Sequence, residues 1–242
     1  MQIRLKTTKN CLEAEGVLIP FDPAIITPAI KHAIESGYFE AEEAAQLPHI
    51  VKPEDIVLDI GAGIGFISTL IARRADRVIS VEANPDLLPY MAALHQLNGV
   101  ENATQLNVVL GDAETGLTTF YQRNDFWMGS LSKGPNPYKS TIKVPNMALN
   151  ALLKKENVTL IVCDIEGAET ILFRNADLNG VDRVYLELHD HITGLKGVAS
   201  VFEAMASRGF AYDPRYSSGA IVLFQRVDKN ETLRPYARLE LT

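Results

Sequence analysis

The sequence of 242 residues has little cysteine, little concentrated positive charge and no long hydrophobic run. Its two cysteines, Cys11 and Cys163, are too few for a disulfide framework, and Cys163 lies in an apolar segment, which favours a reducing compartment. The net charge is −7 and no dense Lys/Arg run occurs, so we expect no nucleic-acid substrate. No stretch approaches a membrane span, and no apolar signal core follows the charged residues 1–6. We therefore expect a cytoplasmic protein without a membrane partner.

An alternation of strands and helices is present from residue 56 onward and predicts an α/β fold. Strand patterns cover residues 56–60, 78–82, 103–110, 159–164 and 182–189. Helical patterns separate several of them, and a further helix is expected over residues 198–208. The last two strands, residues 210–213 and 220–226, are separated by six residues, which favours an antiparallel pair. We predict a Rossmann-like, doubly wound, seven-stranded sheet that is mostly parallel with an antiparallel last strand.

Three regions are expected along the chain. Residues 1–50 should form a helical extension, with helices over residues 23–36 and 40–47, the second stopped by Pro48. Residues 51–228 should form the nucleotide-binding domain, and residues 229–242 a polar tail. The extension is expected either to pack on the sheet or to cover a substrate.

A glycine turn at residues 61–65 is the centre of the predicted binding site. The strand Ile56–Ile60 leads into Gly61, Gly63 and Gly65, and a helix is expected from Phe66. Glycine lets a ligand approach the backbone, and the amides that open the following helix can hold an anionic group. The spacing G-x-G-x-G differs from the dinucleotide pattern G-x-G-x-x-G. Asp59 disfavours a pyrophosphate and suits an ammonium and a sulfonium, so the pattern resembles motif I of the class I methyltransferases, which use S-adenosylmethionine.

Acids at the ends of the second and third strands extend this site. Glu82 is placed to accept hydrogen bonds from both ribose hydroxyls of an adenosine ligand. Asn84 is expected to cap a helix over residues 85–98. In the methyltransferases an acid in the position of Asp112 commonly meets the adenine amino group. The residues expected to bind the cofactor are Asp59, Gly61, Ala62, Gly63, Gly65, Phe66, Glu82, Ala83, Asn84, Asp112, Ala113 and Asp164.

Residues 115–146 interrupt the alternation and are predicted to form a flap over the substrate. Two short strands, residues 118–123 and 140–144, flank a long loop that carries the only tryptophan, Trp127. The loop contains Asn136-Pro137-Tyr138. It does not match the Asn/Asp-Pro-Pro-Tyr motif of enzymes that methylate nucleic-acid amines, because the second proline is missing and the position is different.

The segment Asp164-Ile165-Glu166-Gly167-Ala168-Glu169, with the glycine turn and the flap, resembles the FkbM family of methyltransferases. The resemblance implies O-methylation of a hydroxyl on a sugar, a polyketide or another small molecule. The base would be Asp164 or His189, with Glu166 beside them; a neutral imidazole can accept a proton near pH 7. His189-Asp190-His191 with Asp164 suggests a metal site only weakly, and we predict no metal. The alternatives are a catalytically silent cofactor-binding protein and an NAD-dependent oxidoreductase. The sequence does not define an oligomeric state.

Overall fold

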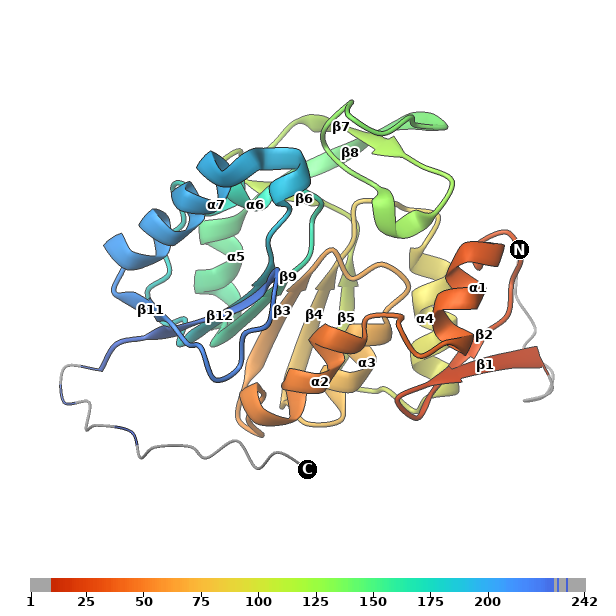
Figure 1. Cartoon of the computed structure of the whole chain (residues 1–242), viewed down its shortest axis with the longest axis horizontal. Coiled ribbons are helices and arrows are strands. Elements are labelled where there is room, and N and C mark those ends of the chain that lie inside the picture. The colour runs from red at the N-terminus through yellow and green to blue at the C-terminus, as the bar shows by residue number, and fades with distance from the viewer. Residues whose placement is uncertain (1–9, 229, 231–233, 235–242) are drawn as a thin grey trace.

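A seven-stranded sheet with the strand order β11-β12-β10-β9-β3-β4-β5 forms the centre of the computed structural model, which describes residues 10–228, 230 and 234 (Figure 1). The strands are β3 (Ile56–Ile60), β4 (Arg77–Val81), β5 (Ala103–Leu106), β9 (Leu160–Cys163), β10 (Arg183–Glu187), β11 (Phe210–Tyr212) and β12 (Ile221–Arg226). β12 pairs antiparallel with both β10 and β11, and the pairs from β10 to β5 are parallel. The predicted fold class is confirmed.

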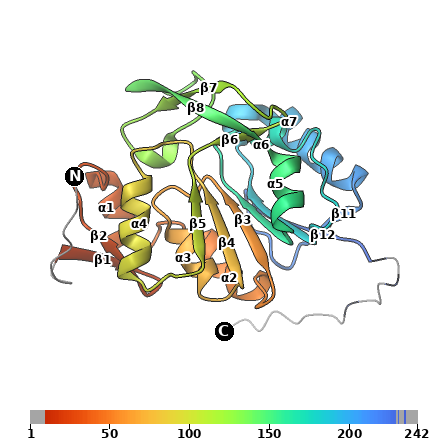
Figure 2. The same cartoon turned by 180° about the vertical axis from the view of Figure 1, so that it is seen from behind.

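Both faces of this sheet are covered, which explains why the central strands β3, β4, β9 and β10 are mostly apolar. Successive residues alternate between two cores: Val57 and Val78 point to one, and Leu58 and Ile79 to the other. The first core is completed by α1 (Pro28–Glu35), α2 (Ala41–Ile50), α3 (Phe66–Ala72) and α4 (Leu88–Leu97). The second is completed by α5 (Leu149–Glu156), α6 (Glu169–Leu172) and α7 (Asp190–Ser207). In Figure 1, α2 and α3 lie in front of the sheet. In Figure 2, which shows the opposite face, α5 lies in front of the sheet.

The N-terminal extension is not purely helical. It begins with an antiparallel hairpin, β1 (Cys11–Ala14) and β2 (Val17–Pro20), which packs on α1, α3 and α4. The expected helix over residues 23–36 is shorter because Thr27 accepts the amide of Ile30 and caps α1. The expected stop at Pro48 is wrong: α2 continues through Pro48 to Ile50. Burial of Leu47 and Ile50 in the first core holds the last turn in place.

Two further boundaries differ from those predicted. The helix expected over residues 85–98 begins at Leu88, since the side chain of Asn84 accepts the amide of Asp86 and forms a turn instead of a helix cap. The helix expected from Val198 begins at Asp190, and it is kinked at Gly194, which has a φ of 66°. The expected tail, residues 229–242, lies outside the described residues except for 230 and 234.

The predicted flap is a hairpin that leaves the main sheet. The strand expected over residues 103–110 is divided: β5 stays in the main sheet, and β6 (Val109–Gly111) pairs in parallel with β8 (Ser140–Ala148). β7 (Leu117–Gln122) pairs antiparallel with β8. Both views place this β7–β8 hairpin across the carboxyl ends of the central strands (Figures 1 and 2). Among the described residues, no helix is both long and apolar enough to cross a membrane.

Candidate functional site

A pocket lies where the strand order of the sheet reverses, between β3 and its neighbours β4 and β9. In doubly wound sheets this switch point is where ligands bind, beyond the carboxyl ends of the strands. Of the expected residues, those lining the pocket are Asp59, Gly61, Ala62, Gly63, Phe66, Glu82, Ala83, Asp164 and Glu166. Gly65, Asn84, Asp112, Ala113 and His189 do not line it. The strand ends therefore assemble most of the expected set in one place.

The glycine turn is held mainly by hydrogen bonds to Val81 and Glu82 at the end of β4. The amides of Gly61 and Ala62 donate to the carbonyl oxygen of Val81 at 2.9 and 3.0 Å, and the amide of Gly65 donates to Ala62. The amide of Gly63 donates to Glu82 Oε2 at 2.8 Å. These four amides are thus already paired, and a role of the amides that open the following helix in holding an anionic group stays a prediction.

Glycine is required at the turn for steric reasons that the structure makes specific. Gly61 has a φ of 87°, and a Cβ there would lie 1.7 Å from the carbonyl oxygen of Asp164. The backbones of β3 and β9 therefore approach each other where their ends meet. Gly63 has a φ of 53°, and its Cβ would lie 3.2 Å from the ring of Phe126 in the flap. Gly63 thus allows the flap to close on the turn.

Glu82 stabilises the turn by hydrogen bonds in addition to facing the pocket. Its two carboxylate oxygens accept the amides of Gly63 and Asn84, at 2.8 and 2.6 Å. Burial raises the pKa of Glu82 to about 7, and the two backbone amides oppose that rise. Each carboxylate oxygen has a second lone pair, so hydrogen bonds to ribose hydroxyls stay sterically possible. That role remains a prediction.

Asp59 is buried at the end of β3 and faces the same pocket. Its Oδ2 accepts the hydroxyl of Ser68 on α3, and Ser80 Oγ on β4 donates to Ser68 Oγ at 2.8 Å. Burial raises the pKa of Asp59 to about 7, against the effect of the Ser68 hydrogen bond. A cationic ligand group beside Asp59 would compensate the buried carboxylate, as expected for the ammonium of the cofactor.

The expected contact of Asp112 with adenine is not supported by its position. Asp112 is exposed and accepts the side-chain amide of Asn175 at 2.8 Å. The cause is the pairing of β6 with β8, which takes the chain away from the main sheet before Asp112. Val108, Val109 and Leu110 line the pocket instead. Asn84 binds the flap, because its Oδ1 accepts the side-chain amide of Gln122 at 2.8 Å.

Aromatic side chains from the extension and the flap meet above the glycine turn. The ring of Phe39 lies 5.2 Å from Phe66, 6.5 Å from Phe126 and 6.2 Å from Trp127, measured between centroids. Thr27 Oγ1 also donates to Asp125 Oδ1 at 2.6 Å, which joins α1 to the flap. All four aromatic residues line the pocket, so the cluster closes it on one side.

Two pocket acids were missed from the sequence, Glu40 and Glu43. Glu43 is 5 % exposed, and burial raises the pKa of both carboxyls, with a hydrogen bond between them. Glu40 has a left-handed φ of 51°, and Glu166 a φ of 50°. Such conformations are uncommon for residues other than glycine and cluster at functional sites. No sequence signal distinguishes these acids from the exposed glutamates that usually open helices.

His189 lies behind the pocket, between three acids. Its Nε2 is 3.3 Å from Asp164 Oδ1 and 4.0 Å from Glu166 Oε2, and its Nδ1 is 3.4 Å from Glu169 Oε1. Glu169 Oε1 also accepts the backbone amide of His189 at 3.1 Å. The structure therefore brings together the three expected catalytic residues, and Glu169 fixes the position of the imidazole.

The charge of His189 differs from the one expected for a base. Burial lowers the pKa of the imidazole, but Asp164 and Glu169 outweigh burial and raise it to about 11. The imidazole is therefore protonated near neutral pH in this arrangement and can donate but not accept a proton. Burial raises the pKa of Glu166 to about 7, although His189 opposes that shift.

Residues 33–143, somewhat less than half of the chain, match the family model of the TRM5/TYW2 methyltransferase domain. A probable ribosomal RNA small subunit methyltransferase A of Methanosarcina mazei is 37 % identical over 91 residues, which cover 34 % of this chain and 32 % of that protein. The corresponding enzyme of Pelotomaculum thermopropionicum is 29 % identical over 123 residues, 48 % of this chain and 39 % of that protein. The chain therefore spans about a third of the length of such curated relatives.

Solved structures are similar over more of the chain but at low identity. TYW2 of M. jannaschii, in complex with AdoMet, is 14 % identical and covers 89 % of this chain and 85 % of its own, with a TM-score of 0.47. Trm5b of Pyrococcus abyssi is 13 % identical and covers 88 % of this chain and 54 % of its own, with a TM-score of 0.49.

These comparisons correct two expectations. The assignment to the FkbM family is wrong, since the matching family model is that of TRM5/TYW2. The six-residue segment Asp164–Glu169 that carried it lies outside the matched region, and Glu169 has the structural role of holding His189. The exclusion of nucleic acid is also wrong, because the two curated relatives described above are named as ribosomal RNA methyltransferases. The α/β methyltransferase fold and the cofactor S-adenosylmethionine are confirmed.

Proposed function

We propose that the chain is an S-adenosylmethionine-dependent methyltransferase whose acceptor is a nucleoside within RNA. The observation that carries the proposal is the family match over residues 33–143, which contains the glycine turn, Glu82 and most of the flap. The names of the RNA-methylating relatives support the acceptor class. The pocket supports methyl transfer in two ways. Its acids can compensate the positive charges of a sulfonium and an ammonium, and its aromatic side chains exclude water.

The distribution of charge is compatible with an RNA acceptor despite the net charge of −7. The hairpin over the pocket, residues 117–144, contains four cations, Arg123, Lys133, Lys139 and Lys143, and one acid, Asp125. The three lysines are exposed, as is Tyr138 between them. Lysines and an exposed aromatic ring are the groups that single-stranded RNA contacts, through phosphates and base stacking.

Asp164, Glu166 and His189 are proposed to position the acceptor and move its proton. Methyl transfer is a displacement at an electrophilic carbon, so placing the nucleophile against that carbon accounts for much of the rate. Asp164 and Glu166 line the pocket, and His189 orients Asp164 from behind. The accepting atom of the nucleoside is left open by this geometry.

The test is incubation of the full chain with a methyl-labelled S-adenosylmethionine and, separately, ribosomal RNA, transfer RNA and small hydroxylated acceptors. We expect label in RNA, and digestion to nucleosides followed by mass spectrometry identifies the methylated atom. Label in a sugar or other small acceptor, with none in RNA, would overturn the RNA acceptor but keep the methyltransferase. Absence of S-adenosylmethionine binding by calorimetry would overturn both and favour a different cofactor.

A further inference from the structure

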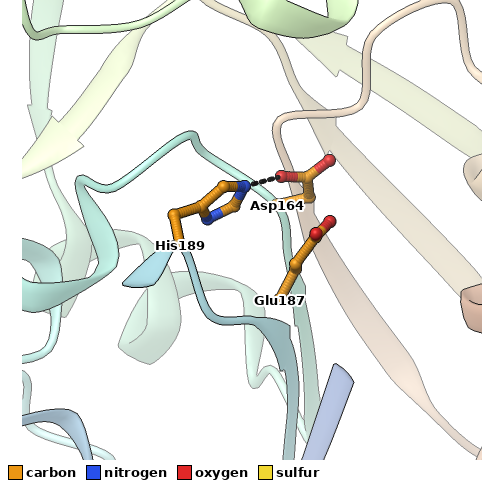
Figure 3. Close-up of side chains that lie close together, drawn as sticks. All are labelled: Asp164, Glu187 and His189. Atoms are coloured by element: carbon orange, nitrogen blue, oxygen red, sulfur yellow. Dashed lines mark ion pairs between the residues drawn. The ribbon is translucent and has the colours of Figure 1, made fainter. Parts of the chain in front are cut away.

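Asp164, Glu187 and His189 form a cluster at the ends of two adjacent strands. Asp164 directly follows β9, and Glu187 ends β10, two residues before His189. One ligand atom from each of the three side chains lies within 4.8 Å of the other two. In Figure 3 the imidazole of His189 faces Asp164 along the dashed line, and the carboxylate of Glu187 points toward that of Asp164. The strand register sets this arrangement, since the parallel pair β9–β10 ends with Leu186 opposite Cys163.

The histidine of this cluster is buried without a well-formed hydrogen bond on its ring. His189 is 3 % exposed, its Nδ1 has no hydrogen-bond partner, and Asp164 Oδ1, which faces Nε2, has none either. Buried polar atoms are normally hydrogen bonded, so unpaired ones require an explanation. Nδ1 faces Glu169, whereas Asp164 Oδ1 faces the point where the three side chains converge, so a ligand at that point would engage Oδ1.

The charge around the cluster favours a cation as that ligand. The described carboxyls near it include Glu40, Glu43 and Glu166 in the pocket and Glu169 behind His189. The Arg123 guanidinium, which acts on Glu166, donates to carbonyl oxygens of the flap. The carboxyls around His189 outnumber this one imidazole, and buried charges are normally paired or coordinate metals.

A second acidic group, Glu40, Glu43 and Asp164, shares one member with the cluster. Its geometry is less suited to a metal, because Glu40 and Glu43 hydrogen bond to each other, which requires that they share a proton. The group with His189 offers two carboxylates and an imidazole nitrogen, which becomes a neutral donor when the cation displaces its proton. That combination lowers repulsion among the ligands and suits Mn²⁺, Fe²⁺ or Zn²⁺ better than Ca²⁺, which takes oxygen ligands.

We propose that Asp164, Glu187 and His189 bind one divalent transition-metal cation beside the cofactor pocket. Ligand distances of roughly 2.0–2.2 Å place opposite ligands about 4 Å apart, close to the spacing of the three groups. Asp164 lines the pocket, so open coordination positions face the acceptor. There the cation binds an acceptor oxygen, holds it toward the methyl group and makes its proton more acidic. The site stands on geometry and does not depend on RNA being the acceptor.

The test uses the purified chain, freed of metal, with Mn²⁺ as the probe. We expect saturable binding of one Mn²⁺ by calorimetry, and a nitrogen coupling from histidine in pulsed electron paramagnetic resonance. His189→Gln should abolish the nitrogen coupling, and Glu187→Gln should weaken Mn²⁺ binding by at least about tenfold, since even groups that only orient metal ligands contribute that much. Zn²⁺ should compete with Mn²⁺ for the same site.

The matched control is Glu42→Gln, which removes the same charge from an exposed side chain on α2 and should leave Mn²⁺ binding unchanged. Thermal unfolding shows whether each variant is folded. If His189→Gln fails to fold, Mn²⁺ binding by Glu187→Gln and the nitrogen coupling of the wild type test the site instead. Absence of saturable Mn²⁺ binding overturns the site. So does binding that is lost in Glu43→Gln and kept in Glu187→Gln, or Mn²⁺ bound without a nitrogen ligand.

Discussion

At the scale of single residues, Glu82 combines a structural and a ligand-binding role. It accepts two backbone amides, one of them from the glycine turn, and it also lines the pocket. Glu82→Ala should weaken S-adenosylmethionine binding by about 1.5–3 kcal/mol, the scale for hydrogen bonds to a charged group. Calorimetry with a 2′-deoxy analogue separates the roles: the analogue should lose affinity for the wild type but little more for the variant. Equal discrimination by both proteins would mean that Glu82 acts only on the turn.

The buried acids also make the stability of the free protein depend on pH. Burial raises the pKa of Asp59 and of Glu82 to about 7, from ordinary values of 3.8 and 4.5. The folded state therefore binds more protons than the unfolded state between about pH 4 and 7. Each of these two acids should make the cofactor-free chain less stable as pH rises through this window and should add no further loss above it.

Asp59→Asn tests the contribution of one acid to this effect. The variant keeps a polar side chain near Ser68 but has no charge to bury. Its melting temperature should fall less than that of the wild type between pH 5 and pH 8, whereas Asp76→Asn, at an exposed position, should behave as the wild type does. A wild type that is equally stable at pH 5 and pH 8 would contradict the burial of charged carboxyls.

At the scale of elements, the sequence predicted those strands whose positions depend on the local pattern of apolar residues. Strand positions of the main sheet followed from apolar runs and the acids that end them, so β3, β4 and β9 and the convergence of Asp59, Glu82 and Asp164 were foreseen. Failures occurred where tertiary contacts override pattern. Core burial carries α2 past Pro48, and the pairing of β6 with β8 removes Asp112 from the pocket.

Other site features had no local signal. Glu40 and Glu43 have the sequence of an ordinary acidic helix start, and only the packing of α2 against α3 turns them toward the pocket. The contact of Phe39 with Phe126 joins residues far apart in the chain. The FkbM assignment failed because a short acidic motif can have a structural cause, as Glu169 shows.

The flap is organised by one buried cation, Arg123. Its guanidinium donates to the carbonyl oxygens of Met128 and Ser132, at 2.9 and 3.0 Å. Arg123→Met should release the loop, raising the acceptor KM by about tenfold, since it removes the hydrogen bonds that this charged group donates to backbone carbonyls of the flap. Hydrogen exchange over residues 126–138 should become faster. Lys143→Met is the control for hydrogen exchange within the hairpin, because Lys143 donates to Thr119 Oγ1 on β7. Unchanged exchange in Arg123→Met would show that other contacts hold the flap.

At the scale of the whole molecule, the distribution of charge matters more than its sum. The chain has 30 acids and 23 Lys and Arg residues, yet the hairpin above the pocket has an excess of cations. Several of the acids line the pocket, where they face the cofactor and not the surface. The net charge was therefore a poor guide to nucleic-acid binding, because it sums the acids that line the pocket with the cations of the hairpin above it.

This distribution gives a prediction about salt. If RNA lies along the hairpin, changing Lys133, Lys139 and Lys143 together to Gln should weaken RNA binding. The slope of log affinity against log salt should fall by roughly 2, since each phosphate contact contributes about 0.7 for single strands.

The control changes Lys52, Lys154 and Lys155 to Gln. These lysines are also exposed, but they precede β3 and β9 in the chain. They therefore lie at the amino-terminal ends of the strands, away from the hairpin at the carboxyl ends. Both variants have the same net charge, so a difference between them reports position alone. Fluorescence anisotropy with a labelled RNA at several salt concentrations measures both slopes. Equal slopes in the two variants would place the RNA elsewhere on the molecule, even if the chain methylates it.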